Sequence, residues 1–150
     1  MSEILGLTKY DKLFLNQLKD WEKLSHAKKR QVACIITKND RPLVTGYNGT
    51  LPGFYNECED EAGETMPHVI HAEMNAISYA AKTGISLEGA TLYCSLAPCT
   101  NCAKLIILSG IKKVLYNDIS SSAAIDLLGE AGVKTVRCRD YSMYRSKHKQ

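Results

Sequence analysis

The second half of the chain alternates short apolar segments with helical ones, and this alternation restricts the fold more than any other feature. Apolar runs at 90–95, 112–116 and 133–138 are typical of buried strands, and the segments 99–109 and 121–131 between them are typical of helices. Strands that alternate with helices imply parallel crossovers and a sheet that helices cover on both faces. The sequence therefore predicts an α/β fold.

The first half adds a helix, a hairpin and a long loop. A Thr-x-x-Asp capping pair followed by helical apolar spacing predicts a helix over residues 8–26, and the apolar, β-branched runs at 32–37 and 42–47 predict hairpin strands. Residues 48–68 carry Gly, Pro, Asn and acidic groups without a period, which indicates a long loop of the kind that often has a function. A further helix is expected over residues 71–82.

Composition favours one globular domain over residues 1–150, with a basic tail at about 139–150. Of the 150 residues 45% are hydrophobic, which is enough for one core. The net charge of +3 is too small for a typical nucleic-acid-binding protein. The sequence has no run of about 18 apolar residues and no secretory signal, so we expect a cytoplasmic protein that does not enter a membrane. Its six cysteines then fit metal ligands or buried thiols better than disulfides.

Two short motifs carry chemistry: His-Ala-Glu at 71–73 and Pro-Cys-Thr-Asn-Cys at 98–102. A Cys-x-x-Cys pair at the start of a helix places both thiolates on nearly one face, and the helix N-terminus favours the thiolate form. We expect Cys99 and Cys102 to bind zinc, with His71 as the third ligand. Three protein ligands leave one tetrahedral position open, which is the pattern of a catalytic zinc that lowers the pKa of a bound water to about 7.

Glu73 lies two residues after His71, near the expected metal but not needed as a ligand. A carboxylate in this place can take a proton from the attacking water and deliver protons to a ring nitrogen and to leaving ammonia. His-x-Glu followed by Pro-Cys-x-x-Cys is a signature of zinc nucleobase deaminases. Each motif alone is weak, because a single Cys-x-x-Cys also suits a redox pair or half of a zinc ribbon. No second Cys-x-x-Cys or His pair is available to close a four-ligand structural site.

The remaining cysteines favour a simpler interpretation. Cys34 and Cys94 lie in apolar strands and Cys138 ends one, so core thiols are expected. Cys58 in the long loop, with His68 nearby, is a candidate for a second zinc, but two further ligands are not evident in the sequence.

The sequence also resembles a known family, the deoxycytidylate (dCMP) deaminases of the cytidine deaminase-like superfamily, over about residues 8–138. The matching segments are QVACI at 31–35, TGYNGT at 45–50, HAEMNAI at 71–77, PCTNCAK at 98–104 and SGIKKV at 109–114. The zinc motifs are shared across the superfamily, and the Gly-Tyr-Asn-Gly element points to the dCMP branch. The resemblance implies a three-layer α/β/α sandwich around a mixed five-stranded sheet. It also implies hydrolysis of dCMP to dUMP and ammonia, which feeds thymidylate synthesis.

The resemblance further implies roles for residues around the zinc. Asn48 would hydrogen-bond the sugar, the Ala72 backbone would contact the base, and Tyr116 would line the pocket. The residues themselves leave simpler roles open, with Asn48 in a plain turn and Tyr116 as a half-buried aromatic at a strand end. A monophosphate needs cationic or backbone donors, and the basic run that ends at Arg30, with Ser25 beside it, is the nearest candidate. A solvated helix end explains that run equally well.

Many members of the resembled family are hexamers activated by dCTP and inhibited by dTTP, with magnesium accompanying the triphosphate. The resemblance therefore implies a homo-oligomer and an effector site that includes Gly46, Tyr47 and Gly49. The loop that follows is shorter than in some members, which carry an insertion with an extra zinc. That second metal site is therefore not carried over.

Three functions remain open at this point. The first is deamination of free dCMP, and the second is the same chemistry on another substrate, such as cytidine, a tRNA adenosine or a pterin-like base. The third is a non-catalytic zinc module that serves assembly. A polynucleotide substrate calls for a broad basic groove and aromatic stacking positions, whereas aromatic residues make up only 7% of the chain. Glu73 argues against the third function, because a structural zinc site needs no carboxylate beside an open position.

Overall fold

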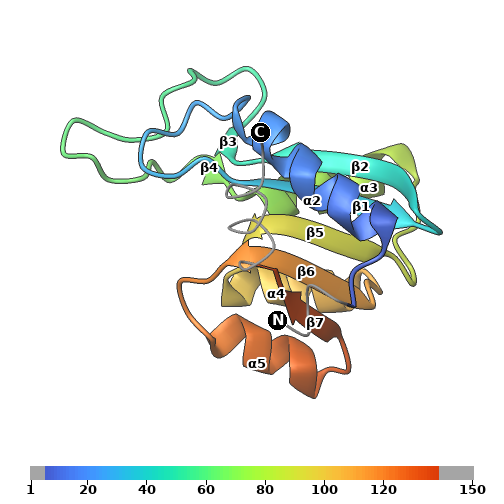
Figure 1. The fold of residues 1–150 in the computed structure, drawn as a ribbon. Coiled ribbons are helices and arrows are strands. Elements are labelled where there is room, and N and C mark those ends of the chain that lie inside the picture. Colours follow the sequence, from blue (N-terminus) through green and yellow to red (C-terminus); the bar gives the residue numbers. More distant parts are fainter. Residues whose placement is uncertain (1–5, 139–150) are drawn as a thin grey trace, which may run out of the picture.

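Residues 6–138, which the computed structural model describes, form a five-stranded mixed sheet with helices on both faces (Figure 1). The strands lie in the order β2 (Arg41–Tyr47), β1 (Ala33–Lys38), β5 (Thr91–Leu96), β6 (Lys113–Asp118) and β7 (Lys134–Arg137). β1 pairs antiparallel with β2 and β5, whereas β5, β6 and β7 run parallel. The predicted α/β fold, with parallel crossovers in the second half, is therefore confirmed. The predicted basic tail at 139–150 lies outside the described residues.

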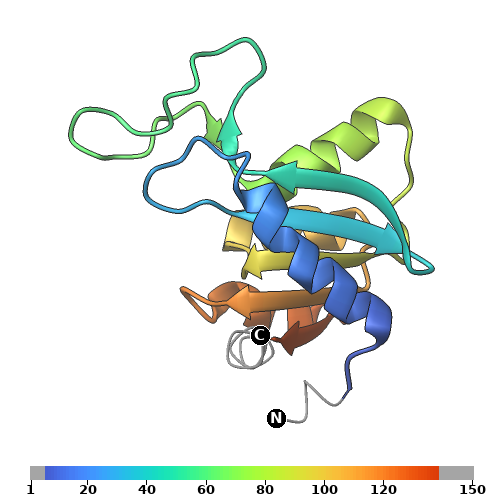
Figure 2. The same cartoon turned by 45° about the horizontal axis from the view of Figure 1, so that its top comes forward.

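Helices cover the two faces of the sheet unequally. α2 (Lys9–Glu22) lies on one face, and α3 (Ala72–Thr83), α4 (Thr100–Leu108) and α5 (Ala123–Glu130) lie on the other (Figure 2). Because successive side chains of a strand point to opposite faces, Ile35 of β1 packs with α2 while Ile36 packs in the core beneath α3. The layers are α/β/α, and burial on both faces accounts for the continuous apolar runs. Within the described residues, no helix has the length and apolar character needed to cross a membrane.

α2 begins at the predicted capping pair but ends earlier than predicted. The N–H of Asp11 donates to the Thr8 hydroxyl at 3.0 Å, and the N–H of Thr8 donates to the Asp11 carboxylate at 3.0 Å, which forms a reciprocal capping box. The helix stops at Glu22 instead of continuing to residue 26. Leu24 continues the helical spacing but is 49% exposed, so extending the helix through it would bury little apolar surface.

The Asp11 carboxylate also joins α2 to the sheet. It is buried and accepts a hydrogen bond from the Tyr93 hydroxyl of β5. We expect Asp11→Ala to lower the free energy of unfolding by about 2–4 kcal/mol, because it removes both a helix cap and the buried hydrogen bond that the Tyr93 hydroxyl donates. Thr8→Ala removes only a capping contact and should cost about 1 kcal/mol. Urea unfolding followed by circular dichroism measures both variants, and equal losses would contradict a stabilising role for the Asp11–Tyr93 contact.

The predicted loop at 48–68 contains more structure than expected. At its base β3 (Gly49–Thr50) pairs with β4 (Val69–Ile70), and farther out a bridge joins Glu59 to Thr65. The loop extends past the end of the main sheet, close to where α3 begins (Figure 2). The base of the loop, where β4 ends, thereby leads directly into α3.

Candidate metal centre and active site

The three predicted zinc ligands meet where two helices begin. His71 is the N-cap residue of α3, Cys99 is the N-cap residue of α4, and Cys102 lies in the first turn of α4. The Nδ1 atom of His71 lies 3.4 Å from Sγ of Cys99 and 3.5 Å from Sγ of Cys102. Two motifs far apart in the sequence therefore form one cluster, as predicted.

The spacing of these ligand atoms fits a tetrahedral zinc ion. Sulfur at about 2.3 Å and imidazole nitrogen at about 2.0 Å from one tetrahedral zinc lie roughly 3.5 Å apart, which matches the separations in this cluster. All three ligand atoms lie within 4.8 Å of one another, and among residues 6–138 no other group of three His, Cys, Asp or Glu residues does so. Cys58 is buried, and His68 stacks on Phe54 with ring centroids 5.2 Å apart. The candidate second-zinc pair thus gains no further ligands from the described residues.

The charges around the zinc ligands favour a cation. Burial raises the pKa of the Cys102 thiol, and the neighbouring Glu73 carboxylate and Cys99 raise it further. A divalent cation between these groups offsets their mutual repulsion and stabilises the thiolates. Two sulfurs and one imidazole nitrogen are a donor set that suits zinc.

Glu73 lies in the first turn of α3, beside the zinc ligands but not among them. The residue is 3% exposed. Burial raises the pKa of its carboxyl to about 7, while a hydrogen bond with Cys102 acts in the opposite direction. Glu73 lines the same cavity as His71 and Cys99. The structure therefore places this carboxyl where the sequence motif predicts it.

A cavity of about 280 Å³ opens beside the zinc ligands. Its wall includes Glu73 near the ligands, and Arg30 and Glu59 from two segments far away in the sequence. Apolar groups make up most of the remaining wall, with a few polar groups between them. A concave, mostly apolar wall with a few placed polar groups is typical of a small-molecule site.

Asn48 lies on the cavity wall, but much of its amide is already engaged. Its Oδ1 atom accepts from the Val32 N–H at 2.9 Å, and its Nδ2 atom donates to the Arg30 carbonyl at 2.8 Å. The side chain therefore holds the segment that precedes β1 against the end of β2. A side-chain amide has two N–H donors and two oxygen lone pairs, so the Asn48 amide still has one of each for a ligand.

The other predicted substrate residues divide into two groups. Ala72 and Arg30 line the cavity. The Ala72 carbonyl accepts from the Cys34 thiol at 3.3 Å, and Arg30 Nη2 forms an ion pair with Asp118 at 2.9 Å. Ser25 and Tyr116 are buried and are not among the described residues of the wall. The Ser25 hydroxyl accepts from the Ala27 N–H at 3.2 Å, and Tyr116 packs in the core of the sheet.

None of the three predicted effector residues is among the described residues of the cavity wall. Gly46 is buried in β2, Tyr47 is half-buried and packs in the core beneath α2, and Gly49 lies in β3. A side chain at Gly46 would place its Cβ 2.4 Å from the Ala72 carbonyl oxygen. Close packing of α3 on β2 is thus a structural reason for glycine at this position, independent of any effector.

Gly46→Ala should therefore disturb the start of α3. The new Cβ would also lie 2.9 Å from the backbone nitrogen of Ala76, and neither contact can be relieved by a side-chain rotation. We expect a loss of about 1–3 kcal/mol in unfolding free energy, together with weaker zinc binding, because His71 precedes the displaced turn. Gly49→Ala is the control, since an added Cβ there meets nothing within 4 Å. Thermal unfolding and zinc titration of both variants measure the effects, and equal effects would refute the packing argument.

Sequence reasoning missed Glu59, Thr65 and Ser120, which also line the cavity. Glu59 and Thr65 come from the long loop, and Ser120 follows β6. Their spacing along the chain carries no signal for the site, because only the fold of the loop and the crossover after β6 bring them to it.

Comparisons with known proteins agree with this geometry. The sequence profile of the cytidine and deoxycytidylate deaminase zinc-binding region matches residues 8–118. The deoxycytidylate deaminase of Enterobacteria phage T4 is 34% identical, over 69% of this chain and 77% of that protein. The human deoxycytidylate deaminase is 35% identical, over 64% of this chain and 60% of that protein.

A solved structure is similar as well. The dCMP deaminase from cyanophage S-TIM5, in complex with dCMP and dUMP, superposes with a TM-score of 0.84 at 35% identity. The match covers 87% of this chain and 98% of that one. With the ligand cluster and its neighbouring carboxylate in place, these matches show that the chain belongs to the deoxycytidylate deaminase family, and that His71, Cys99 and Cys102 are its zinc ligands.

Proposed function

We propose that the protein deaminates deoxycytidine monophosphate, converting dCMP and water to dUMP and ammonia. The observation that carries the proposal is the position of Glu73, which lies beside the zinc ligands on the wall of one cavity. The choice of substrate is supported by the phage relatives, which are deoxycytidylate deaminases, one of them solved with dCMP and dUMP.

Each group has a distinct part in the hydrolysis. His71, Cys99 and Cys102 would hold zinc, which would supply Lewis-acid activation of the attacking water. Glu73 accepts a proton from the attacking water and delivers protons to N3 of the cytosine ring and to the leaving amino group. A carbon–oxygen bond forms at C4 and the carbon–nitrogen bond there breaks, so that cytosine becomes uracil. Burial of Glu73 keeps bulk water away from these transfers.

The remaining cavity residues would hold the nucleotide. The N–H of Ala72 belongs to the first turn of α3, where backbone donors have no partner within the helix, and this supports a contact with the base. The spare N–H of Asn48 supports a contact with the sugar. Arg30 lies on the cavity wall, and its guanidinium would bind the phosphate. The phosphate would then replace Asp118 as the partner of Arg30.

Regulation and assembly stay predictions that rest on the resemblance. Activation by dCTP with magnesium, inhibition by dTTP and a homo-oligomeric state belong to this group, while a cytoplasmic location stays a prediction from the sequence. Initial rates with each triphosphate test the first two, and light scattering at several protein concentrations tests the assembly.

Ammonia release tests the proposed substrate. We would compare dCMP, deoxycytidine, CMP and adenosine side by side with zinc-loaded protein, and we expect selective turnover of dCMP. Equal kcat/KM values for dCMP and deoxycytidine would contradict phosphate recognition. Turnover of adenosine in place of dCMP would assign the site to another base.

A further inference from the structure

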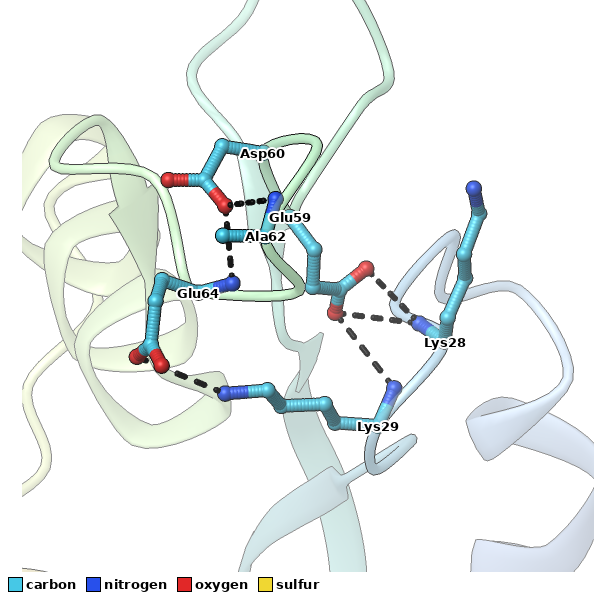
Figure 3. Close-up of polar contacts among 6 residues, drawn as sticks. All are labelled: Lys28, Lys29, Glu59, Asp60, Ala62 and Glu64. Atoms are coloured by element: carbon cyan, nitrogen blue, oxygen red, sulfur yellow. Dashed lines mark hydrogen bonds and ion pairs between the residues drawn. The ribbon is translucent and has the colours of Figure 1, made fainter.

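Two consecutive backbone N–H groups on the basic segment before β1 point at one carboxylate. The N–H of Lys28 donates to both oxygens of Glu59, at 3.0 and 3.1 Å, and the N–H of Lys29 donates to Oε2 of Glu59 at 3.4 Å (Figure 3). Successive N–H groups that converge in this way form a concave site for an anion. In the structure the anion at this site is the Glu59 side chain, from a loop about thirty residues further along the chain.

The loop that presents Glu59 is held by its own hydrogen bonds. The Asp60 carboxylate accepts from the N–H groups of Ala62 and Glu64, both at 2.9 Å (Figure 3). The Asp60 N–H also donates to the Glu64 carbonyl at 2.8 Å. The bridge between Glu59 and Thr65 closes this turn at its base. Glu59 therefore reaches the basic segment from an ordered turn.

This anion site borders the cavity that lies beside the zinc ligands. Lys29, Arg30 and Glu59 all line it. The two cations are also paired with carboxylates, since Lys29 Nζ lies 3.8 Å from Glu64 and Arg30 Nη2 lies 2.9 Å from Asp118. Among the described residues, carboxylates thus contact the Lys28 and Lys29 N–H groups, the Lys29 ammonium and the Arg30 guanidinium.

We propose that the Lys28 and Lys29 N–H groups form the subsite for the substrate's phosphate, and that Glu59 is an internal competitor which the phosphate displaces. This inference rests on the proposed function. A phosphate monoester carries about two negative charges and three acceptor oxygens, so it is a stronger acceptor than one carboxylate for the same donors. A nucleoside has no group that can replace Glu59. Glu59 therefore sets the affinity for a phosphate without affecting the binding of the base and sugar.

Glu59→Gln tests the competition, with Glu61→Gln as the matched control. Both changes remove one negative charge from the same loop, but Glu61 is exposed and forms no hydrogen bond or ion pair with the described residues. The probes are dUMP and deoxyuridine, whose dissociation constants are measured by calorimetry on the zinc-loaded protein. We expect Glu59→Gln to tighten dUMP binding at least about threefold beyond Glu61→Gln, because a neutral amide competes more weakly for the two donors. Deoxyuridine binding should stay the same in both variants.

Weaker or unchanged dUMP binding in Glu59→Gln, relative to the control, would overturn the proposal. A second measurement does not depend on the variant. In ¹⁵N-labelled wild-type protein, the amide resonances of Lys28 and Lys29 should shift with dUMP and with inorganic phosphate, but not with deoxyuridine. Unshifted resonances at saturating dUMP would also overturn it. If wild-type protein releases no ammonia from dCMP, the proposed function fails, and the amide shifts still decide whether the phosphate subsite exists.

Discussion

Glu73→Gln should abolish turnover of dCMP while the protein keeps its zinc. The amide has nearly the shape of the carboxylate but cannot accept the proton of the attacking water or pass it to the ring and the leaving group. General acid–base groups contribute about 10²–10⁴ in rate, and this residue serves more than one transfer, so we expect kcat to fall by about 10³-fold or more. Steady-state kinetics with dCMP and zinc analysis of the same sample give the two quantities.

The position of Glu73 makes the outcome informative. The residue is buried beside the zinc ligands but is not one of them, so zinc content and fold should both survive the substitution. A Glu73→Gln protein that keeps its zinc and retains more than about a tenth of the wild-type kcat would refute the acid–base role. Loss of zinc in this variant would instead make Glu73 a ligand, against the geometry of the site.

Cys102→Ala should remove both zinc and activity. Cys102 is 1% exposed, and its sulfur lies 3.5 Å from the Nδ1 atom of His71, so no solvent molecule easily takes its place. Removal of an outer-shell partner weakens metal affinity about 10–100-fold, and loss of a direct ligand should exceed that range. Because zinc binding also stabilises the folded state, we expect a lower melting temperature at the same zinc concentration.

Cys94→Ala is the matched control for this prediction. Cys94 is equally buried, in β5, but its thiol donates to the Leu115 carbonyl at 3.8 Å and lies outside the ligand cluster. The Cys94→Ala substitution should lower the free energy of unfolding by leaving a small cavity, and it should leave the zinc stoichiometry unchanged. Equal zinc loss in both variants would show that the effect comes from core packing and not from ligation.

The zinc ligands and Glu73 could be predicted from the sequence because their chemistry is local. Each motif opens a helix, so a few residues determine both the donor atoms and their orientation. The fold class could be predicted for a similar reason, since the alternation of strands and helices in the second half restricts the topology. The end of α2 could not be predicted in this way. Leu24 fits the helical spacing, but its exposure shows that periodicity alone does not reveal which positions are buried.

The wall of the cavity could be predicted only in part, because long-range contacts build it. Arg30 was a candidate from the basic run, but its partner Asp118 stands at the end of β6, and the sequence gives no sign of that pairing. Glu59 reaches the cavity only through the turn of its loop. Tyr116 shows that a position at a strand end does not by itself decide which way a side chain faces. A strand-end aromatic can face a pocket or the core, and here it packs in the core of the sheet.

Isotope labelling follows the oxygen and nitrogen atoms through the hydrolytic deamination of dCMP at the zinc site. Zinc-loaded protein would be incubated with dCMP in ¹⁸O-water, and the product identified by mass spectrometry. We expect dUMP that carries one ¹⁸O atom on its uracil ring, with one ammonia released per dUMP, and no product from the Glu73→Gln protein. Unchanged dCMP after incubation with fully zinc-loaded wild-type protein would show that the protein does not deaminate dCMP.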